Sequence, residues 1–435
     1  MAFSNFDALQ RRPMVQRGAK AIKFVGAAAL AVSLVFSSAV AHADDWIGTW
    51  TASVQPVWAP DFPVPTNIPR NLWNQTIRQT VRASIGGKQV RVVFTNEYGT
   101  RPLLIGAAHV ALADKGAAIV AGSDRKLTFG GKDSIEVPPG APAISDPVAL
   151  DVAPLAKLSV SLFVPRTEPA SSMHWDGRDT AYIVAGDQTA AADFKPDSTI
   201  VSRIFLSGVM VDAAADARVV VTFGDSITDG DGSTVDAFNR WPDHLAARLA
   251  QAGGPPVAVL NQGISGAKIL NDRMGVNALA RFDRDVLNQP HVTTVTLMMG
   301  INDIGWPGCA LAPNDREPTA EEIIAGYQQL VTRAHLHGLR IIGVTLTPFG
   351  DAFQGTPFEG YYSEAKEKIR IAVNEWIRNS GAFDGVIDFD KVVRDPAKPT
   401  HIQPQFDKGD HLHPNPAGYQ AMAEAIDLNQ LLGNK

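Results

Sequence analysis

The chain has 435 residues, which exceeds the usual size of one domain and predicts two. Hydrophobic residues make up 45% of the sequence and charged residues 19%, values that are ordinary for a soluble globular protein. The formal net charge of −6 gives no basic surface of the kind that binds nucleic acid, so no nucleic-acid partner is expected.

The N-terminal segment 1–43 has the parts of a secretory signal peptide. Basic residues precede an apolar segment at 24–40, and Ala41-His42-Ala43 offers a small-x-small cleavage site. We expect residues 1–43 to be removed, so that the protein is periplasmic or secreted, with no stable membrane insertion afterwards. An N-terminal membrane anchor ranks second, because the apolar segment is short and Asp44-Asp45 follow it at once.

Cys309 is the only cysteine, so the chain forms no intramolecular disulfide. An exported protein without disulfides needs a core large enough to be stable alone, and a chain of this length supplies one. Cys309 lies in a Gly- and Pro-rich segment without a cysteine-hydrolase pattern, so a packed or lid thiol is expected.

Residues 44–210 are expected to form an all-β accessory domain, a sandwich or a jelly roll. Segments 76–82 and 89–94 alternate in polarity on either side of Gly86-Gly87, which predicts a β-hairpin. Pro and Gly clusters separate most of the further strands that we expect, at 107–112, 126–129, 134–137, 148–152, 158–164 and 180–184.

Residues 218–435 have a different pattern, and segment 211–217 (VDAAADA) has the small, unpatterned sequence of a linker. Apolar, β-branched segments alternate with helical ones, which predicts an α/β domain with a parallel sheet covered on both faces. The expected strands are 218–223, 257–260, 292–299, 340–346 and 385–389, and the expected helices are 241–252, 277–287, 320–337, 364–380 and 416–427.

Four short segments of this second half carry reactive or donor groups: 224–227 (GDSI), 261–266 (NQGISG), 300–303 (GIND) and 410–413 (DHLH). The first three each follow an expected strand directly, and the fourth lies in the long loop after the last strand. Ligands of such sheets bind beyond the carboxyl ends of the strands, so we expect all four segments to meet at one edge.

Ester hydrolysis needs a nucleophile, a base with an orienting carboxylate, and donors for the oxyanion. Ser226 is the predicted nucleophile, His413 the base and Asp410 the carboxylate, because a spacing of three puts the last two on one face of a turn. The predicted oxyanion donors are the backbone N–H of Gly266, the side-chain amide of Asn302 and the N–H of Ser226 itself. The chemistry requires no metal and no organic cofactor.

Each of these residues also has a purely structural interpretation. Gly-Asp-Ser is a common turn, Gly266 suits a turn, and Asn302 suits a loop cap. His411 competes with its neighbour as the base, and Asp303 is a competing carboxylate that we expect to brace its own loop. The joint order of strand–Ser, strand–Gly, strand–Asn and Asp-x-x-His favours the catalytic interpretation.

With these segments, and with 223–228 (FGDSIT), the region from 218 to 428 resembles an SGNH hydrolase of the GDSL esterase/lipase superfamily. The resemblance implies a three-layer, flavodoxin-like α/β/α fold. It also implies that Ser226, Gly266, Asn302 and His413 are the four residues for which the SGNH group is named, with Asp410 as the acid. Ile227 replaces the leucine of the GDSL pattern. A β-rich module ahead of the catalytic unit is similar to exported bacterial members of the superfamily.

The sequence therefore predicts a secreted or periplasmic carboxylic-ester hydrolase that works through an acyl-serine intermediate on short acyl esters, among which acetylated carbohydrate is one candidate. Its activity is expected to fall at acidic pH as His413 gains a proton, near the reference pKa of ~6.5. The partner is a small-molecule or polysaccharide ester.

The choice of ester stays open. Five of the eight tryptophans lie in the N-terminal half and suit stacking on an acetylated sugar, although core or junction positions are favoured for most of them; they are Trp46, Trp50, Trp58, Trp73 and Trp175. A lipase or arylesterase with 304–318 as a lid, including Trp306, is the second version, and an acyltransferase the third. A non-catalytic glycan-binding protein is a different class, against which the complete catalytic set argues.

Overall fold

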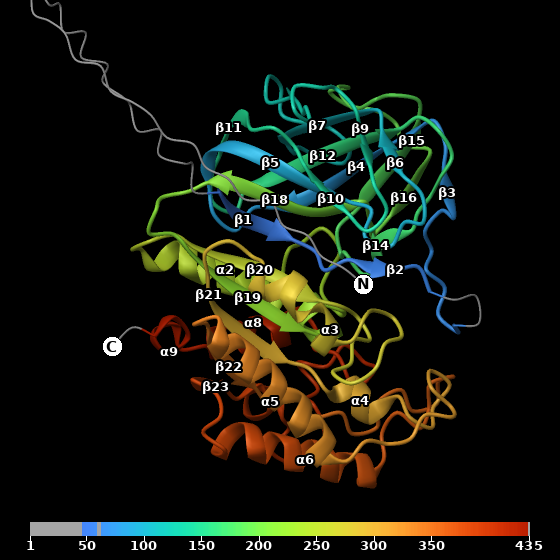
Figure 1. Ribbon diagram of the computed structural model, residues 1–435. Coiled ribbons are helices and arrows are strands. Elements are labelled where there is room, and N and C mark those ends of the chain that lie inside the picture. The colour runs from blue at the N-terminus through green and yellow to red at the C-terminus, as the bar shows by residue number, and fades with distance from the viewer. Residues whose placement is uncertain (1–45, 59–61, 434–435) are drawn as a thin grey trace, which may run out of the picture. The chain divides into compact units, whose positions relative to one another are not determined.

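The computed structural model describes residues 46–58 and 62–433 (Figure 1). The expected signal peptide at 1–43 lies outside the described residues. A β-rich part comes first, in blue to green in Figure 1, and an α/β part follows in yellow-green to red. Among the described helices, none combines the length and the apolar character that crossing a membrane requires.

Two antiparallel sheets make up most of the β-rich part. The first has the order β1 (Trp46–Thr51), β18 (Leu206–Asp212), β5 (Gly87–Thr95) and β10 (Pro142–Ile144), and β11 (Val148–Val152) also pairs with β5. The second has the order β16 (Ser198–Ile200), β15 (Ala181–Ala185), β4 (Gln75–Arg82), β12 (Lys157–Val164), β7 (Ala107–Leu112) and β8 (Arg125–Lys126). Val92 of β5 and Val160 of β12 belong to the same buried core. The β-rich character is confirmed, and the sandwich or jelly-roll assignment stays a prediction.

Three smaller sheets complete this part. One joins β2 (Gln55–Pro56), β14 (Ser172–His174) and β17 (Arg203–Ile204). The others pair β3 (Asn71–Leu72) with β13 (Glu168–Pro169), and β6 (Leu103–Ile105) with β9 (Ile135–Val137).

The predicted hairpin around Gly86-Gly87 is wrong. Both strands form, but β4 pairs with β12 and β15, whereas β5 pairs with β18, β10 and β11. The connection crosses between the two sheets, because Ala83 N–H donates to Ala156 O and Ser84 N–H donates to Thr49 O, both at 2.9 Å. Alternation predicted the strands correctly, but the choice of partner depends on segments distant in the sequence.

The α/β part contains one parallel sheet of five strands, as expected. Its order is β20 (Val257–Gly263), β19 (Arg218–Gly224), β21 (Val292–Met298), β22 (Arg340–Val344) and β23 (Gly385–Ile387). Numbered along the chain this is 2-1-3-4-5, the flavodoxin-like order, which places a binding site where neighbouring connections leave in opposite directions.

Helices cover both faces of the sheet, which confirms the three layers. Val220 of β19 packs in one core with Trp241 of α2 (Trp241–Ala252), and Val219 and Val221 lie in the other core with Tyr327 of α5 (Ala320–Leu336). In Figure 1, α5 and α6 (Glu364–Asn379) lie side by side, in agreement with their contacts. The longer helices are α2 (Trp241–Ala252), α5 (Ala320–Leu336), α6 (Glu364–Asn379) and α8 (Pro416–Glu424).

The expected helix at 277–287 is divided into α3 (Ala278–Phe282) and a π-helical turn, η1 (Asp283–Leu287). Four short helices were not expected, because four or five residues are too few to show a period: α1 (Ser226–Asp229), α4 (Ile301–Gly305), α7 (Phe389–Val393) and α9 (Leu428–Leu432). Two of them, α1 and α4, begin at the predicted site.

Candidate active site

The structure brings the predicted nucleophile, base and carboxylate together. Ser226 Oγ lies 2.8 Å from His413 Nε2, and His413 Nδ1 lies 2.7 Å from Asp410 Oδ2. The second oxygen of Asp410 accepts the N–H groups of Leu412 at 3.0 Å and His413 at 2.9 Å, which fixes the carboxylate beside the ring. This order of hydroxyl, imidazole and carboxylate is the one that activates a serine.

Ser226 reaches the edge of the sheet because β19 turns directly into α1. Asp225 is the N-cap of this helix, and its Oδ1 accepts the N–H of Ile227 at 3.1 Å. A Cβ at position 224 would lie 2.1 Å from Thr228 Oγ1, so only glycine fits where the strand meets the helix. The strand therefore delivers the hydroxyl to the carboxyl end of the sheet.

His413 is buried between two carboxylates, Asp410 and Asp231. Burial lowers the pKa of His413, but Asp231 and Asp410 outweigh burial and raise that pKa above 6.5. Burial also opposes the ionisation of Asp410, but His413 and Lys408 hold the pKa of Asp410 well below its usual range. Asp410 is thus an anion at all working pH values, as an orienting carboxylate must be.

Asp231 and Lys408 were missed by sequence reasoning. Asp231 Oδ2 lies 3.6 Å from His413 Nδ1, and Lys408 Nζ lies 2.7 Å from Asp231 and 3.3 Å from Asp410. Asp231 lies only five positions after Ser226 along the chain, so its closeness to the serine could have been inferred from the sequence. No feature of the sequence indicated Lys408.

In the loop after β20, Gly266 has a backbone conformation that residues with a Cβ rarely adopt. Its φ is +75°, and a Cβ there would lie 2.3 Å from Met274 Sδ and 2.8 Å from the Trp306 ring. The Gly266 N–H has no acceptor among the described residues. An unused N–H beside the serine is suited to an oxyanion.

Asn302, in α4, is held in one orientation by its neighbours. Its Oδ1 accepts hydrogen bonds from Trp306 Nε1 at 2.8 Å and from the Tyr361 hydroxyl at 2.9 Å. Its Nδ2 donates one hydrogen to Ala267 O at 3.0 Å. Because the oxygen is occupied by two donors, the amide presents its remaining N–H to the pocket.

Ser226, Gly266, Asn302 and His413 line a pocket of about 180 Å³. Apolar side chains form most of its wall: Val64, Trp175, Met274, Trp306, Leu311, Phe353, Phe358, Tyr361 and Leu412. Val64 and Trp175 come from the β-rich part, so both parts of the chain build the pocket.

Other candidate residues lie elsewhere. His411 is exposed and pairs with Asp407, which leaves His413 as the histidine at the serine. Asp303 accepts its own backbone N–H, as expected of a carboxylate that braces its loop, but it also accepts the N–H groups of Ile269 at 2.8 Å and Leu270 at 3.0 Å, in the loop that carries Gly266. Cys309 is buried, in agreement with a packed thiol.

The tryptophans of the β-rich part differ in position. Trp58 donates its Nε1–H to Met274 O at 2.8 Å, at the junction with the α/β part. Trp73 is 67% exposed. Only Trp175 of the five lines the pocket of Ser226.

Among the described residues, one group of side chains is close enough to share a metal ion: Asp231, Asp410 and His413, with ligand atoms within 4.8 Å of one another. Lys408 Nζ already lies against both carboxylates, and His413 Nδ1 is bonded to Asp410. The negative charge of Asp231 and Asp410 is therefore balanced by side chains of the protein.

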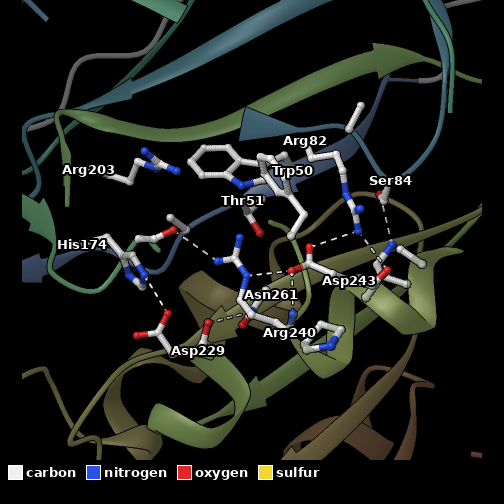
Figure 2. Close-up of a pocket in the computed structure, with 17 residues that line it drawn as sticks. Trp50, Thr51, Arg82, Ser84, His174, Arg203, Asp229, Arg240, Asp243 and Asn261 are labelled. Atoms are coloured by element: carbon white, nitrogen blue, oxygen red, sulfur yellow. Dashed lines mark hydrogen bonds and ion pairs between the residues drawn. The ribbon is translucent and has the colours of Figure 1, made fainter. Parts of the chain in front are cut away.

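A second, smaller cavity of about 40 Å³ lies between the β-rich and α/β parts (Figure 2). Trp50, Arg82 and His174 line it from one part, and Asp229 and Arg240 from the other. It has room for a few water molecules only and does not include Ser226. Ionic contacts between the β-rich and α/β parts lie along its walls.

Residues 220–426 match the family model GDSL-like Lipase/Acylhydrolase. No curated protein matches the chain. Similar solved structures include a putative lipolytic protein of the G-D-S-L family from Desulfitobacterium hafniense DCB-2, with 20% identity over 48% of this chain and 96% of that one, and a TM-score of 0.35.

Two further structures carry more specific names. The aryl esterase of M. smegmatis has 21% identity over 48% of this chain and 95% of its own, with a TM-score of 0.37. A carbohydrate acetylesterase family member from Sinorhizobium meliloti has 19% identity over 50% of this chain and 99% of its own, with a TM-score of 0.38. Over residues 220–426 the α/β part of this chain is therefore similar to the GDSL-like lipase/acylhydrolase family, and a β-rich module precedes it.

Proposed function

We propose that this protein is a serine carboxylic-ester hydrolase, with Ser226 as nucleophile, His413 as general base and Asp410 as the orienting carboxylate. One observation carries the proposal: the hydrogen-bonded chain from Ser226 to Asp410 opens into a pocket in which Gly266 and Asn302 hold unused donors.

The reaction has two halves. His413 Nε2 takes the hydroxyl proton as Ser226 Oγ attacks the ester carbonyl carbon, and the Gly266 N–H, the Asn302 amide and the Ser226 N–H stabilise the oxyanion. The C–O bond then breaks, and His413 returns the proton to the departing alcohol. His413 then takes a proton from water as the water oxygen attacks the acyl carbon. The bond between that carbon and Ser226 Oγ breaks, His413 returns the proton to Oγ, and the acid leaves.

The pocket favours a short, apolar acyl group on an alkyl or aryl alcohol. Its volume of about 180 Å³ is below the ~300–1,000 Å³ of sites for drug-sized ligands. A sugar inside it would set hydroxyl groups against Trp175, Trp306 and Phe353 without partners, which costs free energy. An acetyl group on a carbohydrate outside the pocket is the second candidate, because the acyl part alone still fits.

The test is hydrolysis of p-nitrophenyl esters of increasing acyl length, beside acetylated xylan. We expect kcat/KM to be highest for short acyl chains and to fall as the chain exceeds the pocket. Ser226→Ala should remove turnover while the circular dichroism spectrum stays unchanged. Wild-type rates in that variant would refute the nucleophile, and long-chain preference would refute the short pocket.

The same assay separates the alternatives. Added alcohol that diverts product from acid to a new ester would identify an acyltransferase. Binding of polysaccharide with no turnover of any ester would identify a glycan-binding protein. Deacetylation of xylan alone would favour the carbohydrate esterase.

We also propose export, on the pattern of residues 1–43. N-terminal sequencing of the protein recovered from the periplasm or medium should begin at Asp44. Recovery of the unprocessed chain in the membrane fraction would favour the anchor.

A further inference from the structure

His174, the last residue of β14, is a buried histidine of the β-rich part that reaches into the α/β part. Its side chain is only 6% exposed. Its Nδ1 lies 2.9 Å from Ser53 O, and its Nε2 lies 2.9 Å from Asp229 Oδ1. In Figure 2, the ring of His174 faces Asp229 across the boundary between the two parts.

The two partners of His174 determine its protonation. A carbonyl oxygen and a carboxylate both accept hydrogen bonds, so each ring nitrogen has to carry a hydrogen and the ring is a cation. Burial lowers the pKa of His174, but Asp229 and the Ser53 carbonyl outweigh burial and raise that pKa above its usual value. His174 and Asp229 therefore form a buried ion pair.

Asp229 connects this ion pair to both halves of the catalytic machinery. It is the third residue after Ser226 in α1. Its other oxygen, Oδ2, accepts the backbone N–H of Ser265 at 2.9 Å and the Ser265 hydroxyl at 3.0 Å. Ser265 directly precedes Gly266, so one carboxylate ties the helix of the nucleophile to the loop of the oxyanion donor.

We propose that His174 is a positioning residue for the ester hydrolase reaction. Its ion pair with Asp229 fixes Ser265 and thereby aims the Gly266 N–H at the oxyanion. The inference rests on the proposed function, because an oxyanion forms only if Ser226 attacks a carbonyl. It makes the β-rich part a component of catalysis, since that part supplies the cation.

The test compares two substitutions of the same residue. In His174→Asn, the shorter amide keeps a donor near Ser53 O but does not reach Asp229, whereas the longer amide of His174→Gln does. We expect His174→Asn to lower kcat by about 10- to 100-fold with KM near the wild-type value. Inhibition by an alkylboronic acid, whose tetrahedral adduct mimics the oxyanion, should weaken by the same factor. His174→Gln should recover part of both.

His109 provides the matched control. It pairs with Asp124 at 2.9 Å inside the β-rich part, away from the pocket of Ser226. His109→Asn should leave kcat and boronic acid inhibition unchanged for the folded protein. If His174→Asn does not fold, Ser265→Ala replaces it, because loss of the hydroxyl contact should lower kcat and boronic acid affinity in parallel.

Two results would overturn the inference. One is a folded His174→Asn, or Ser265→Ala in its place, with wild-type kcat and boronic acid inhibition; the other is a loss confined to KM. Either leaves the proposed function standing if the wild type hydrolyses esters and Ser226→Ala does not. A wild type without ester hydrolysis would instead refute the proposed function.

Discussion

His413 lies between Asp410 and Asp231, and these two charges set how readily it takes a proton. Only the neutral ring acts as a base. Since the pKa of His413 is raised, the inactive cation persists above pH 6.5, and kcat/KM should rise with pH around a midpoint above that value. The loss of activity on the acidic side of the pH profile should therefore begin at a higher pH than the reference pKa of histidine predicts.

The measurement is kcat/KM on p-nitrophenyl acetate from pH 5 to 9. Asp231→Asn removes one charge that favours the cation, so its midpoint should move to lower pH. Asp133→Asn, on an exposed carboxylate paired with Lys126, should leave the midpoint in place. A wild-type midpoint at or below 6.5, or no shift in Asp231→Asn, would contradict this account of His413.

The sequence predicted those site residues that lie in recognisable local patterns. Ser226, Gly266 and Asn302 each follow a strand, and the structure places all three around one pocket. Tyr361 could not be predicted, because it reaches Asn302 from 59 positions away and depends on how a long loop folds back. His174 was hidden for the same reason, since its partner Asp229 lies in the other part of the chain.

Among the elements, α6 has a function beyond covering the sheet. Its Lys366 is buried, and Nζ donates to the carbonyl oxygens of Gly305 at 2.9 Å, Pro307 at 2.7 Å and Gly360 at 2.7 Å. These carbonyls flank Trp306 and Tyr361, the two side chains that orient Asn302. The ammonium group of Lys366 thus holds the segment around Trp306 and the segment before Tyr361 in place.

Lys366→Met should lower the free energy of unfolding by about 2–4 kcal/mol, because three carbonyl groups lose a charged donor. It should also lower kcat, since the Asn302 amide loses its fixed orientation. Lys368→Met, at an exposed position of the same helix, should change stability by no more than about 0.5 kcal/mol. Urea denaturation and ester kinetics of the two variants make the comparison; equal effects would argue against the role of Lys366.

Periodicity predicted the long elements well and the pairing of strands poorly. Helix α2 and strands β7 and β11 have the bounds expected from the sequence. The hairpin between β4 and β5 was wrong because alternation says which residues face inward but not which strand lies alongside. The split of 277–287 into α3 and η1 was also invisible to an apolar pattern, which continues through both.

For the molecule as a whole, ionic contacts join the β-rich and α/β parts. Asp179 pairs with Arg240 at 2.9 Å, and Arg82 pairs with Asp243 at 3.3 Å, whereas the second partner of Asp179, Arg203 at 3.0 Å, belongs to its own part (Figure 2 shows the arginines and Asp243). Separating the parts would leave buried charges without partners, which is strongly destabilising. The division into domains 44–210 and 218–435 stays a prediction about folding.

We expect residues 44–435 to unfold in one cooperative transition. Differential scanning calorimetry should give a calorimetric enthalpy about equal to the van't Hoff enthalpy. Asp179→Ala should lower the midpoint of that single transition rather than divide it. Two separate transitions in the wild type would instead mean that the parts fold independently.

The shared pocket wall has a consequence for protein engineering. Because Val64 and Trp175 line the pocket of Ser226 and His174 reaches Asp229, the α/β part does not build this pocket without the β-rich part. A chimera that exchanges the β-rich module for that of another protein would have to carry matching side chains at these three positions. An exchange of modules therefore has to keep the residues at the contact between the two parts, or change the residues on both sides of that contact together.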